Sequence, residues 1–328
     1  MMRMTVLASG SKGNSTVISS SRTRVLVDAG LSCRELVRRM HLAGEDPHAL
    51  DAILITHEHQ DHVAGLGVLA RKLGVPVYFT EPTHRAWVRM LTPRRTLSYA
   101  EWLDQMQREK EERARVAAGG AQPGICDSMS AAVEQTTASD PLEDSDESEA
   151  SPSVSAKPDP TFLPSVEYFR AGSRFSIGDI EVTPFTIPHD AADPCGFVFS
   201  AEGARMALAT DLGYMPPNVK AALRRIDVLL LESNHDLEML KDGPYPWSVK
   251  QRVLSRVGHL SNHATAEFLE QDYDGSAAFI VLGHLSESNN APELARMAAE
   301  QALAGHPKLL GNRILLADQG SPLESIVL

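Results

Sequence analysis

The strongest constraint on the fold is a run of aliphatic residues that ends in a cluster of metal-binding side-chain types. Residues 52–55 are aliphatic and have strand length, and Thr56-His57-Glu58-His59-Gln60-Asp61-His62 follows them directly. Imidazole nitrogens and carboxylate oxygens suit Zn²⁺, Mn²⁺ or Fe²⁺. Side chains two apart in an extended chain point the same way, so we expect His57 and His59 to face one ion. Asp61 and His62, past the turn, are expected to face a second ion. A single histidine is more often structural, but burying four such groups together without compensation would be costly.

Short aliphatic or β-branched runs recur on both sides of this loop, and helical patterns lie between several of them. The predicted strands are residues 4–8, 16–19, 25–27, 52–55, 75–79, 182–185, 197–200, 206–209, 228–231, 278–282 and 314–317. The predicted helices are residues 33–43, 63–73, 217–225, 247–257, 264–270 and 292–303. Hairpin-like neighbours occur together with strand–helix–strand crossovers. This mixture favours an α/β sandwich with mixed sheets over a purely parallel sheet.

Composition excludes several classes of protein. No apolar stretch approaches the ~20 residues of a membrane span, and the apolar part of the N-terminus is too short for a signal peptide. The cysteines Cys33, Cys126 and Cys195 are widely spaced and give no disulfide framework. The formal net charge of −12 argues against a basic DNA-coating protein. We therefore expect a cytoplasmic enzyme without a membrane partner, and leave its oligomeric state open.

One segment differs in composition from the rest of the chain. Residues 134–160 hold eight acidic residues against one lysine and are rich in serine and proline. Such a segment cannot bury enough apolar surface to offset the entropy of ordering it. We predict a disordered acidic loop at 119–164, preceded by a charged helical insertion at 98–118. The folded domain would then comprise residues 1–97 and 165–328. A solvated loop is the favoured interpretation, and the alternative is a loop that binds a protein partner.

Residues 57–62 resemble the H-x-H-x-D-H signature of the metallo-β-lactamase fold. Four further positions match that family's motifs in the expected order, each at the end of a predicted strand: Asp28, His189, Asp211 and His284. The resemblance implies a four-layer αββα sandwich with two mixed β-sheets. It also implies that His189 joins His57 and His59 on the first metal ion, and that His284 joins Asp61 and His62 on the second. In the same family pattern Asp211 bridges both ions and Asp28 braces the metal loop.

Other segments are similar to one branch of that family, the YycJ/WalJ-type metallohydrolases of bacteria. The similar segments are residues 7–15, 232–236, 258–262 and 283–290, and the resemblance covers the chain except about 98–163. It implies a dinuclear hydrolase with exonuclease activity on double-stranded DNA and a link to DNA repair. The expected cofactors are two divalent ions, Zn²⁺ first and Mn²⁺ or Fe²⁺ as alternatives. The expected partners are DNA ends.

Phosphodiester hydrolysis also requires groups that handle protons. Asp61 can accept a hydrogen bond from the attacking hydroxide and orient it. His235 is the preferred donor of a proton to the leaving group, although a role in fixing a turn explains it equally well. His259 and His263 are weaker candidates for the same role.

Polar side chains near predicted strand ends are candidates for substrate contact. Ser11, Asn14 and Ser15 lie in the glycine-containing loop after the first strand, where backbone N–H groups can approach an anion. A plain hairpin turn explains the same residues. Asn289, beyond the strand that precedes His284, is a further candidate for substrate binding.

The acidity of the chain is the main objection to a DNA substrate, because phosphate contacts dominate the affinity of proteins for nucleic acids. The basic residues that could offset it are Arg22, Arg24, Arg34, Arg38, Arg39, Arg71 and Lys72. One alternative is a hydrolase of a small-molecule or RNA phosphodiester acting at the same site. Another is a regulatory scaffold whose metal site is only structural. The complete set of ligand residues argues against the scaffold, because a structural role requires no open two-metal site.

Overall fold

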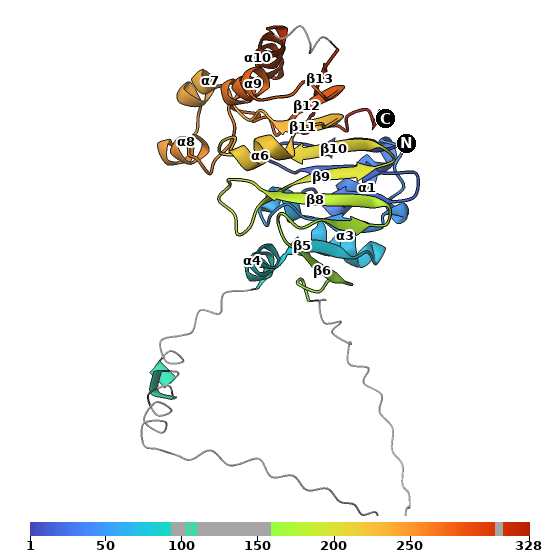
Figure 1. Ribbon diagram of the computed structural model, residues 1–328. Helices are drawn as coiled ribbons and strands as arrows, with labels where there is room; N and C mark the ends of the chain where they lie inside the picture. Colours follow the sequence, from blue (N-terminus) through green and yellow to red (C-terminus); the bar gives the residue numbers. More distant parts are fainter. Residues whose placement is uncertain (93–102, 105, 109, 111–158, 306–310) are drawn as a thin grey trace, which may run out of the picture. The chain divides into compact units, whose positions relative to one another are not determined.

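The computed structural model describes residues 1–92, 103–104, 106–108, 110, 159–305 and 311–328 (Figure 1). The chain divides into two compact units, Met1–Thr92 with Asp159–Leu328, and Pro93–Pro158. The described residues of the second unit, 103–104, 106–108 and 110, are helical. The other positions of the predicted helical insertion at 98–118, and residues 119–158 of the predicted acidic loop, lie outside the described residues.

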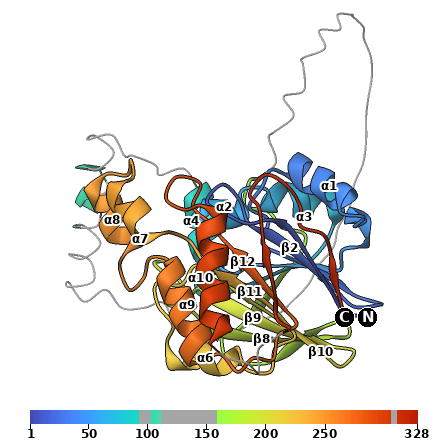
Figure 2. The same ribbon diagram turned by 90° about the horizontal axis from the view of Figure 1, so that it is seen from above.

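The first unit contains two seven-stranded sheets that face each other (Figures 1 and 2). The first sheet has the strand order β14-β1-β2-β3-β4-β5-β6, and the second has the order β13-β12-β11-β10-β9-β8-β7. The neighbouring pairs from β3 to β6 and from β10 to β13 are parallel. All other pairs, including β2 with β3 and β9 with β10, are antiparallel. Both sheets are therefore mixed, as the sequence predicts.

The observed strands and helices can be compared with those predicted from the sequence. The strands are β1 (Arg3–Ala8), β2 (Ser15–Ser19), β3 (Arg24–Val27), β4 (Ala52–Leu54), β5 (Val77–Thr80), β6 (Val166–Phe169), β7 (Phe175–Ile177), β8 (Ile180–Thr186), β9 (Cys195–Ala201), β10 (Ala204–Ala209), β11 (Val228–Glu232), β12 (Phe279–Gly283), β13 (Arg313–Leu316) and β14 (Ile326–Val327). The helices are α1 (Cys33–Leu42), α2 (Gln60–Val63), α3 (Leu66–Leu73), α4 (Glu81–Leu91), α6 (Pro217–Ala222), α7 (Leu237–Asp242), α8 (Trp247–Val253), α9 (Asn262–Gln271) and α10 (Pro292–Ala304), with a 3₁₀ turn at Pro47–Ala49. The predictions omitted α4, α7 and the edge strands β6, β7 and β14. Helix α4 had a local signal, because Thr80 caps its N-terminus and Pro82 occupies its first turn.

Three apolar layers hold the sandwich together. Side chains such as Val27 and Phe197 form the layer between the two sheets. A second layer, which includes Leu36 and Trp87, lies between the first sheet and helices α1, α3 and α4. The third, which includes Leu231 and Phe268, lies between the second sheet and helices α6, α9 and α10 (Figure 2). The predicted four-layer αββα architecture is thereby confirmed.

The parallel strands determine where functional residues meet. Strand β11 is buried along its whole length, which is typical of a strand covered on both faces. Carboxyl ends of parallel neighbours lie at the same edge of a sheet, so the loops after β10, β11 and β12 are adjacent. The loops after β3 and β4 are adjacent in the first sheet for the same reason.

The far boundary of the predicted acidic loop requires a correction. Residues 159–164 were assigned to the loop, but they pack on the first unit. The Arg71 guanidinium donates a hydrogen bond of 2.9 Å to the carbonyl oxygen of Phe162, and Leu163 is buried against the first sheet. These contacts arise from the two apolar residues at 162 and 163, which the composition of the surrounding segment obscured.

Within the part of the chain that the structure describes, no helix combines the length and the apolar character needed to cross a membrane.

Candidate metal centre

Three histidine side chains converge beyond the ends of β4 and β8. The Nε2 atom of His57 lies 3.1 Å from Nδ1 of His59, which lies 3.2 Å from Nε2 of His189. A neutral imidazole has one donor and one acceptor nitrogen, so hydrogen bonds alone do not account for three nitrogens pointing at one spot. Nitrogens that bind a tetrahedral ion at 2.0–2.1 Å are separated by about 3.3 Å. The three histidines can therefore hold one metal ion.

A second group of side chains lies next to the first. The Nε2 atom of His62 is 3.4 Å from an oxygen of Asp61 and 3.4 Å from an oxygen of Asp211. His284 approaches the same carboxylates, with Nε2 3.7 Å from Asp61 and Nδ1 3.2 Å from Asp211. The structure thus brings all seven residues that the sequence proposed as ligands into one continuous cluster.

Asp211 connects the two groups. Its Oδ1 atom lies 3.9 Å from His189 Nε2, and its Oδ2 atom lies 3.4 Å from His62 Nε2. Oδ2 is buried and has no hydrogen-bond partner among the described residues. A buried carboxylate oxygen without a partner is costly, and a cation on either side of Asp211 would remove that cost. This oxygen and the donor set around it fit a centre of two divalent ions.

Asp28 holds one ligand in place. One carboxylate oxygen accepts a hydrogen bond of 2.9 Å from the Thr56 amide, and the other lies 2.8 Å from Nδ1 of His62. An imidazole that donates from Nδ1 directs the lone pair of Nε2 at Asp61 and Asp211. Asp28 is 2% exposed, so water does not compete for these bonds.

The electrostatic environment favours the metal-binding protonation state at His57, Asp61 and Asp211 and opposes it at His62 and His284. Burial keeps the pKa of His57 well below its ordinary value, so its ring is neutral. Burial raises the pKa of Asp61 and Asp211, but the neighbouring histidines outweigh that effect and lower both below their ordinary value. Asp211 in turn raises the pKa of His62 and of His284 against the opposing effect of burial. Cations must therefore compete with protons at these two rings.

Three residues of the site adopt a left-handed backbone conformation. The φ angles are 61° at Asp28, 63° at Asp211 and 55° at His284. This conformation costs of order 1 kcal/mol or more for a residue with a side chain, although Asp and His tolerate it better than most. Asp28 and His284 lie directly after β3 and β12, and Asp211 lies two residues after the end of β10. The sharp turn there directs the side chain into the cluster.

One glycine allows the metal loop to approach the loop after β3. A Cβ atom on Gly30 would lie 1.7 Å from the carbonyl oxygen of Asp61. The Asn14 amide donates a hydrogen bond of 2.7 Å to that same oxygen, and its side chain donates one of 3.1 Å to the carboxylate of Asp61. Asn14 is 6% exposed and is thereby occupied in positioning Asp61.

Two site residues were not among the proposed ligands or catalytic groups. Glu232, the last residue of β11, is fully buried, and its Oε1 atom lies 2.8 Å from His259 Nδ1 and 3.0 Å from His284 Nδ1. Burial raises the pKa of Glu232, but the adjacent His259 outweighs this and lowers it to about 2. The ring of His259 lies between those of His189 and His284, with centroids 5.2 and 5.1 Å away. An acidic residue directly at the end of a fully apolar strand was the available signal for Glu232.

The structure does not bring His235 to the cluster. His235 is 1% exposed, and neither of its ring nitrogens has a hydrogen-bond partner among the described residues. Burial lowers its pKa to about 4. A proton donor must reach the leaving group, and in this part of the site His259 is the histidine that faces the metal cluster. The proposed role of His235 is corrected accordingly.

Three of the proposed substrate contacts also require correction, and Asn14, described above, is one of them. The Ser15 hydroxyl is buried and donates a hydrogen bond of 2.9 Å to the carbonyl of Asp28, so it stabilises the turn after β3. Asn289 is 1% exposed and its carbonyl accepts a hydrogen bond from the Asp236 amide. Neither side chain is available to a substrate. Ser11 is exposed in the loop after β1, where contact with a substrate stays a prediction.

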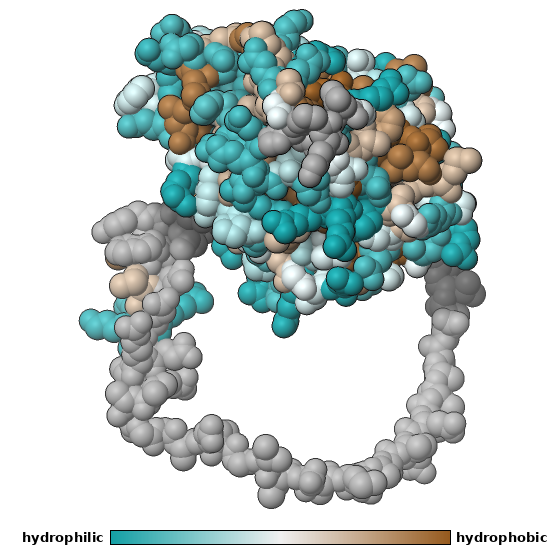
Figure 3. Space-filling model, turned by 45° about the horizontal axis from the view of Figure 1, so that its top comes forward, coloured by the Kyte–Doolittle hydropathy of each residue, from teal (hydrophilic) through white to brown (hydrophobic). Residues whose placement is uncertain are grey.

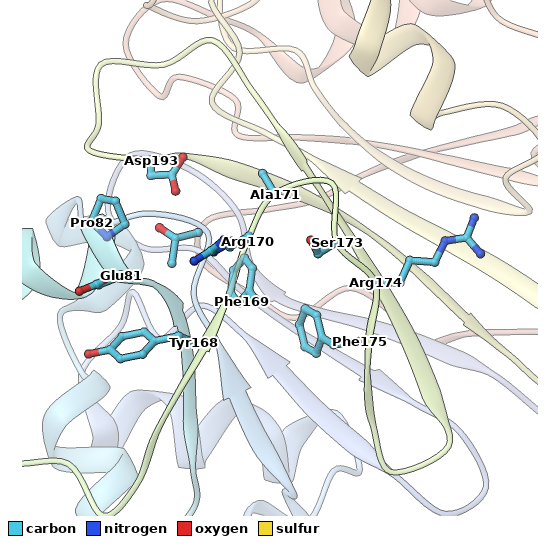
Figure 4. Close-up of a pocket in the computed structure, with 11 residues that line it drawn as sticks. Glu81, Pro82, Tyr168, Phe169, Arg170, Ala171, Ser173, Arg174, Phe175 and Asp193 are labelled. Atoms are coloured by element: carbon cyan, nitrogen blue, oxygen red, sulfur yellow. The ribbon is translucent and has the colours of Figure 1, made fainter.

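A cavity of about 810 Å³ adjoins the loop that carries His189 (Figure 4). The described residues that line it are Thr80, Glu81, Pro82, Tyr168, Phe169, Arg170, Ala171, Ser173, Arg174, Phe175 and Asp193. Phe169 and Phe175 stack along it, with ring centroids 5.3 Å apart (Figure 4). The Thr83 hydroxyl donates to the carbonyl of Asp193 and connects this region to the His189 loop. The lining contains none of the seven ligand residues, so the cavity is separate from the metal cluster.

This fold and its cluster of histidines and aspartates define a metal-dependent hydrolase site. Residues 8–249 match the Metallo-beta-lactamase superfamily, and the chain belongs to that superfamily. The predicted family resemblance is therefore confirmed.

Two curated relatives are similar to most of the chain. The chain is 32% identical over 302 residues to exodeoxyribonuclease WalJ of Streptococcus pneumoniae serotype 2, which covers 92% of this chain and 88% of WalJ. It is 33% identical over 302 residues to exodeoxyribonuclease YycJ of Bacillus anthracis, which covers 92% of this chain and 89% of YycJ. Among solved structures, the metallo-beta-lactamase fold protein YhfI from Bacillus subtilis aligns with a TM-score of 0.58 at 13% identity. That alignment covers 99% of this chain and 100% of YhfI, and it supports the fold alone.

Proposed function

We propose that this protein is an exodeoxyribonuclease that hydrolyses phosphodiester bonds at the ends of duplex DNA, with two divalent metal ions bound at the cluster. The observation that carries the proposal is the position of Asp211, a buried carboxylate between two groups of ligand side chains. Two adjacent cations suit phosphodiester hydrolysis, because both the attacking and the leaving oxygen need charge stabilisation. DNA is proposed as the substrate because the two relatives described above are exodeoxyribonucleases.

The ligand residues are assigned as the sequence proposed. His57, His59 and His189 hold one ion, and Asp61, His62 and His284 hold the other. The bound ions supply positive charge at the phosphate and lower the pKa of water toward neutrality. The histidine-rich first group suits Zn²⁺, and the carboxylates of the second also suit Mn²⁺ or Fe²⁺.

Asp61 orients the attacking water. Its side chain is 23% exposed, which makes it the most accessible carboxylate of the cluster, and its lowered pKa keeps it an acceptor. Asn14 holds one of its oxygens with a hydrogen bond of 3.1 Å. The fixed carboxylate accepts a hydrogen bond from the water and directs the oxygen lone pair at the phosphorus.

His259 protonates the leaving oxygen. Glu232 accepts a hydrogen bond of 2.8 Å from Nδ1 of His259, which fixes the orientation of the ring. The His259 side chain is 19% exposed, whereas that of Glu232 is fully buried. His259 can therefore exchange protons with solvent between turnovers while Glu232 holds its orientation.

The test uses duplex DNA labelled at one end and protein loaded with Zn²⁺ or Mn²⁺. Stepwise shortening of the duplex is expected, and the position of the label gives the direction of digestion. EDTA treatment and Asp211→Ala should both abolish the shortening. A matched control is Asp227→Ala, because Asp227 sits at the opposite end of β11 and accepts a hydrogen bond from the Arg205 amide. A protein shown to hold two ions that leaves duplex ends intact would contradict the DNA substrate and favour a small or RNA phosphodiester.

A further inference from the structure

The segment between Glu232 and His259 leaves the sheet and returns to it beside the cluster. We call residues 237–257 the α7–α8 arm. At its start, the Asp236 amide donates a hydrogen bond of 2.9 Å to the carbonyl of Asn289. At its end, the Asp190 amide donates one of 3.1 Å to the carbonyl of Val257. Figures 1 and 2 show α7 and α8 projecting beside the rest of the sandwich.

Two contacts fix the end of the arm to loops that carry ligand residues. The Arg252 guanidinium makes two hydrogen bonds to the carboxylate of Asp190, the residue after His189. A Cβ atom on Gly213 would lie 2.2 Å from the carbonyl group of Arg256, so glycine allows the close approach of the arm to the loop after Asp211. The position of the arm is therefore coupled to the metal centre.

The arm exposes apolar and aromatic surface. Trp247 is 67% exposed and Leu254 is 52% exposed. Within the described residues, α8 buries none of its side chains. Figure 3 shows hydrophobic side chains gathered among hydrophilic ones over this part of the molecule, at the upper left. A helix without a buried face gains little from packing on its own domain, and an exposed tryptophan is suited to stacking on a base.

The arm is locally basic in an acidic chain. The arm holds Lys241, Lys250, Arg252 and Arg256 against Glu238 and Asp242, a formal charge of +2. The Lys250 ammonium donates to the carbonyl of Lys241, and the Arg256 guanidinium lies 4.1 Å from the centroid of the Tyr214 ring. Among the described residues, neither of these two cations forms an ion pair with a carboxylate. Their charge is available to a phosphate.

Four of the seven basic residues that the sequence offered as a DNA patch already have carboxylate partners. Arg22 pairs with Asp179 at 3.3 Å, and Arg24 lies 4.0 Å from Glu45. Arg38 and Arg39 both pair with Glu35, at 2.6 and 2.7 Å. A cation that already has a carboxylate partner contributes little to the binding of a polyanion.

We infer that the α7–α8 arm binds the end of duplex DNA and presents it to the metal centre. Trp247 stacks on the terminal base pair, while Lys250 and Arg256 contact backbone phosphates. This inference rests on the proposed function, since it names the surface that gives the same site its preference for duplex ends. Charge complementarity and an exposed aromatic residue on the same arm favour DNA over a protein occupant.

The experiment compares the metal-loaded protein with Trp247→Ala and with the double variant Lys250→Gln and Arg256→Gln. Matched controls are Leu42→Ala, at an apolar residue 65% exposed on α1, and Arg170→Gln, at the cavity of Figure 4. Rates are measured on an end-labelled duplex at several salt concentrations and on thymidine 5′-(p-nitrophenyl) phosphate. Thermal unfolding reports whether each variant is folded.

For Trp247→Ala we expect the ratio of kcat/KM on duplex to kcat/KM on the small ester to fall about 5- to 100-fold, mainly through KM. For the double variant we expect the slope of log kcat/KM against log salt to become shallower by about 2, or 0.9 per lost phosphate contact. Leu42→Ala and Arg170→Gln should retain the parental slope. Unchanged ratios and slopes in the arm variants would overturn the inference, as would a loss of slope confined to Arg170→Gln.

Two further measurements separate the arm from the proposed function. If the parent hydrolyses the small ester but leaves duplex intact, the proposed function fails. Binding of a fluorescent duplex with phosphorothioate ends then tests the arm directly, and equal affinity of parent and Trp247→Ala would overturn it. Sedimentation of the parent and Trp247→Ala shows whether the apolar surface joins two copies of the chain. A parental dimer that Trp247→Ala converts to a monomer would also overturn the inference.

Discussion

Replacing Asp28 with asparagine tests whether the second metal ion depends on the tautomer of His62. The Thr56 amide donates to one oxygen of Asp28, so in Asp28→Asn the new carbonyl is expected to keep that position. The new NH₂ group must then face Nδ1 of His62, 2.8 Å from the present oxygen. Because NH₂ is a donor, Nδ1 must accept, and the proton of the ring moves to Nε2. That nitrogen can then no longer bind a metal ion.

The magnitude follows from the bonds that are lost. A hydrogen bond to a charged group contributes about 1.5–3 kcal/mol, which corresponds to roughly a 10- to 100-fold change in an equilibrium constant. We therefore expect the affinity for one of the two ions to fall by this factor. The affinity for the ion at His57, His59 and His189 should stay at the parental value, because Asp28 has no hydrogen bond to these three side chains in the described structure.

The assay is a titration of both ions against a chelator of known affinity, followed by a count of bound ions per chain. Asp51→Asn is the matched control, because Asp51 accepts a hydrogen bond of 2.8 Å from the Arg24 amide at the opposite end of β3 and β4. It should bind both ions as the parent does. Parental affinity for both ions in Asp28→Asn would refute the reasoning.

Four other predictions follow from the same structure. His259→Ala should lower kcat on DNA by about 10²- to 10⁴-fold but affect a p-nitrophenyl ester much less, since that leaving group needs no proton; equal losses would contradict its role as a proton donor. Gly30→Ala should lower the free energy of unfolding by about 1–3 kcal/mol in urea titrations, because the added carbon meets the carbonyl of Asp61, whereas Gly305→Ala, with no atom closer than 4.0 Å, should not. Burial lowers the pKa of His235 from 6.5 to about 4, so between these pH values the unfolded chain binds a proton that the folded chain does not, and the free energy of unfolding falls as the pH falls. His235→Leu should remove about 2–3 kcal/mol of this decrease between pH 7 and 4.5. If the free energy of unfolding of the parent and of His235→Leu changes in parallel with pH, His235 does not titrate in this range. Deletion of residues 119–158 should leave kcat on duplex DNA unchanged, because both sheets and all seven ligand residues lie outside them; loss of activity in a folded protein would assign the insertion a role in catalysis.

The ligand residues could be predicted from the sequence because their signal is local. His57, His59, Asp61 and His62 lie within six positions, and the distant ligands each follow a run of strand-forming residues. The same alternation of strands and helices predicted the two mixed sheets. Edge strands such as β6 and β7 were missed because they are short and largely exposed, so their hydrophobic pattern is weak.

Glu232 and His259 could not be assigned from pattern alone. Glu232 lies between Asp211 and His284 only because β11 pairs with β10 on one side and with β12 on the other. His259 reaches the cluster only because the α7–α8 arm leaves the sheet and returns. Both positions depend on strand order and loop path, which one sequence does not reveal. The sequence analysis preferred His235 over His259, yet the side chain of His235 is buried.

The substrate residues were misassigned for a related reason. A loop that makes a sharp turn has buried backbone groups of its own, and these need hydrogen-bond partners. Ser15 supplies one to the carbonyl of Asp28, whose backbone is left-handed, and Asn14 supplies donors to Gly10 and Asp61. Polar side chains beside an active site therefore often hold the turns that aim the ligands, and a pattern of serine and asparagine does not distinguish the two roles.

The net charge of a chain does not predict whether it binds DNA, because only nearby charges act on a bound phosphate. Electrostatic interactions between exposed charges are screened beyond about 8–10 Å at physiological salt, so a phosphate responds to the charges near its binding site and not to the total of −12. The acidic partners of Arg22, Arg24, Arg38 and Arg39 lie within 4.0 Å and neutralise those cations locally. Lys250 and Arg256 lack such partners among the described residues, and Arg252 and Arg256 of the same arm contact the loops that carry His189 and Asp211. If DNA reaches this metal centre, its approach should therefore depend on two cations and one tryptophan, and its salt dependence should be correspondingly shallow for a nucleic-acid enzyme.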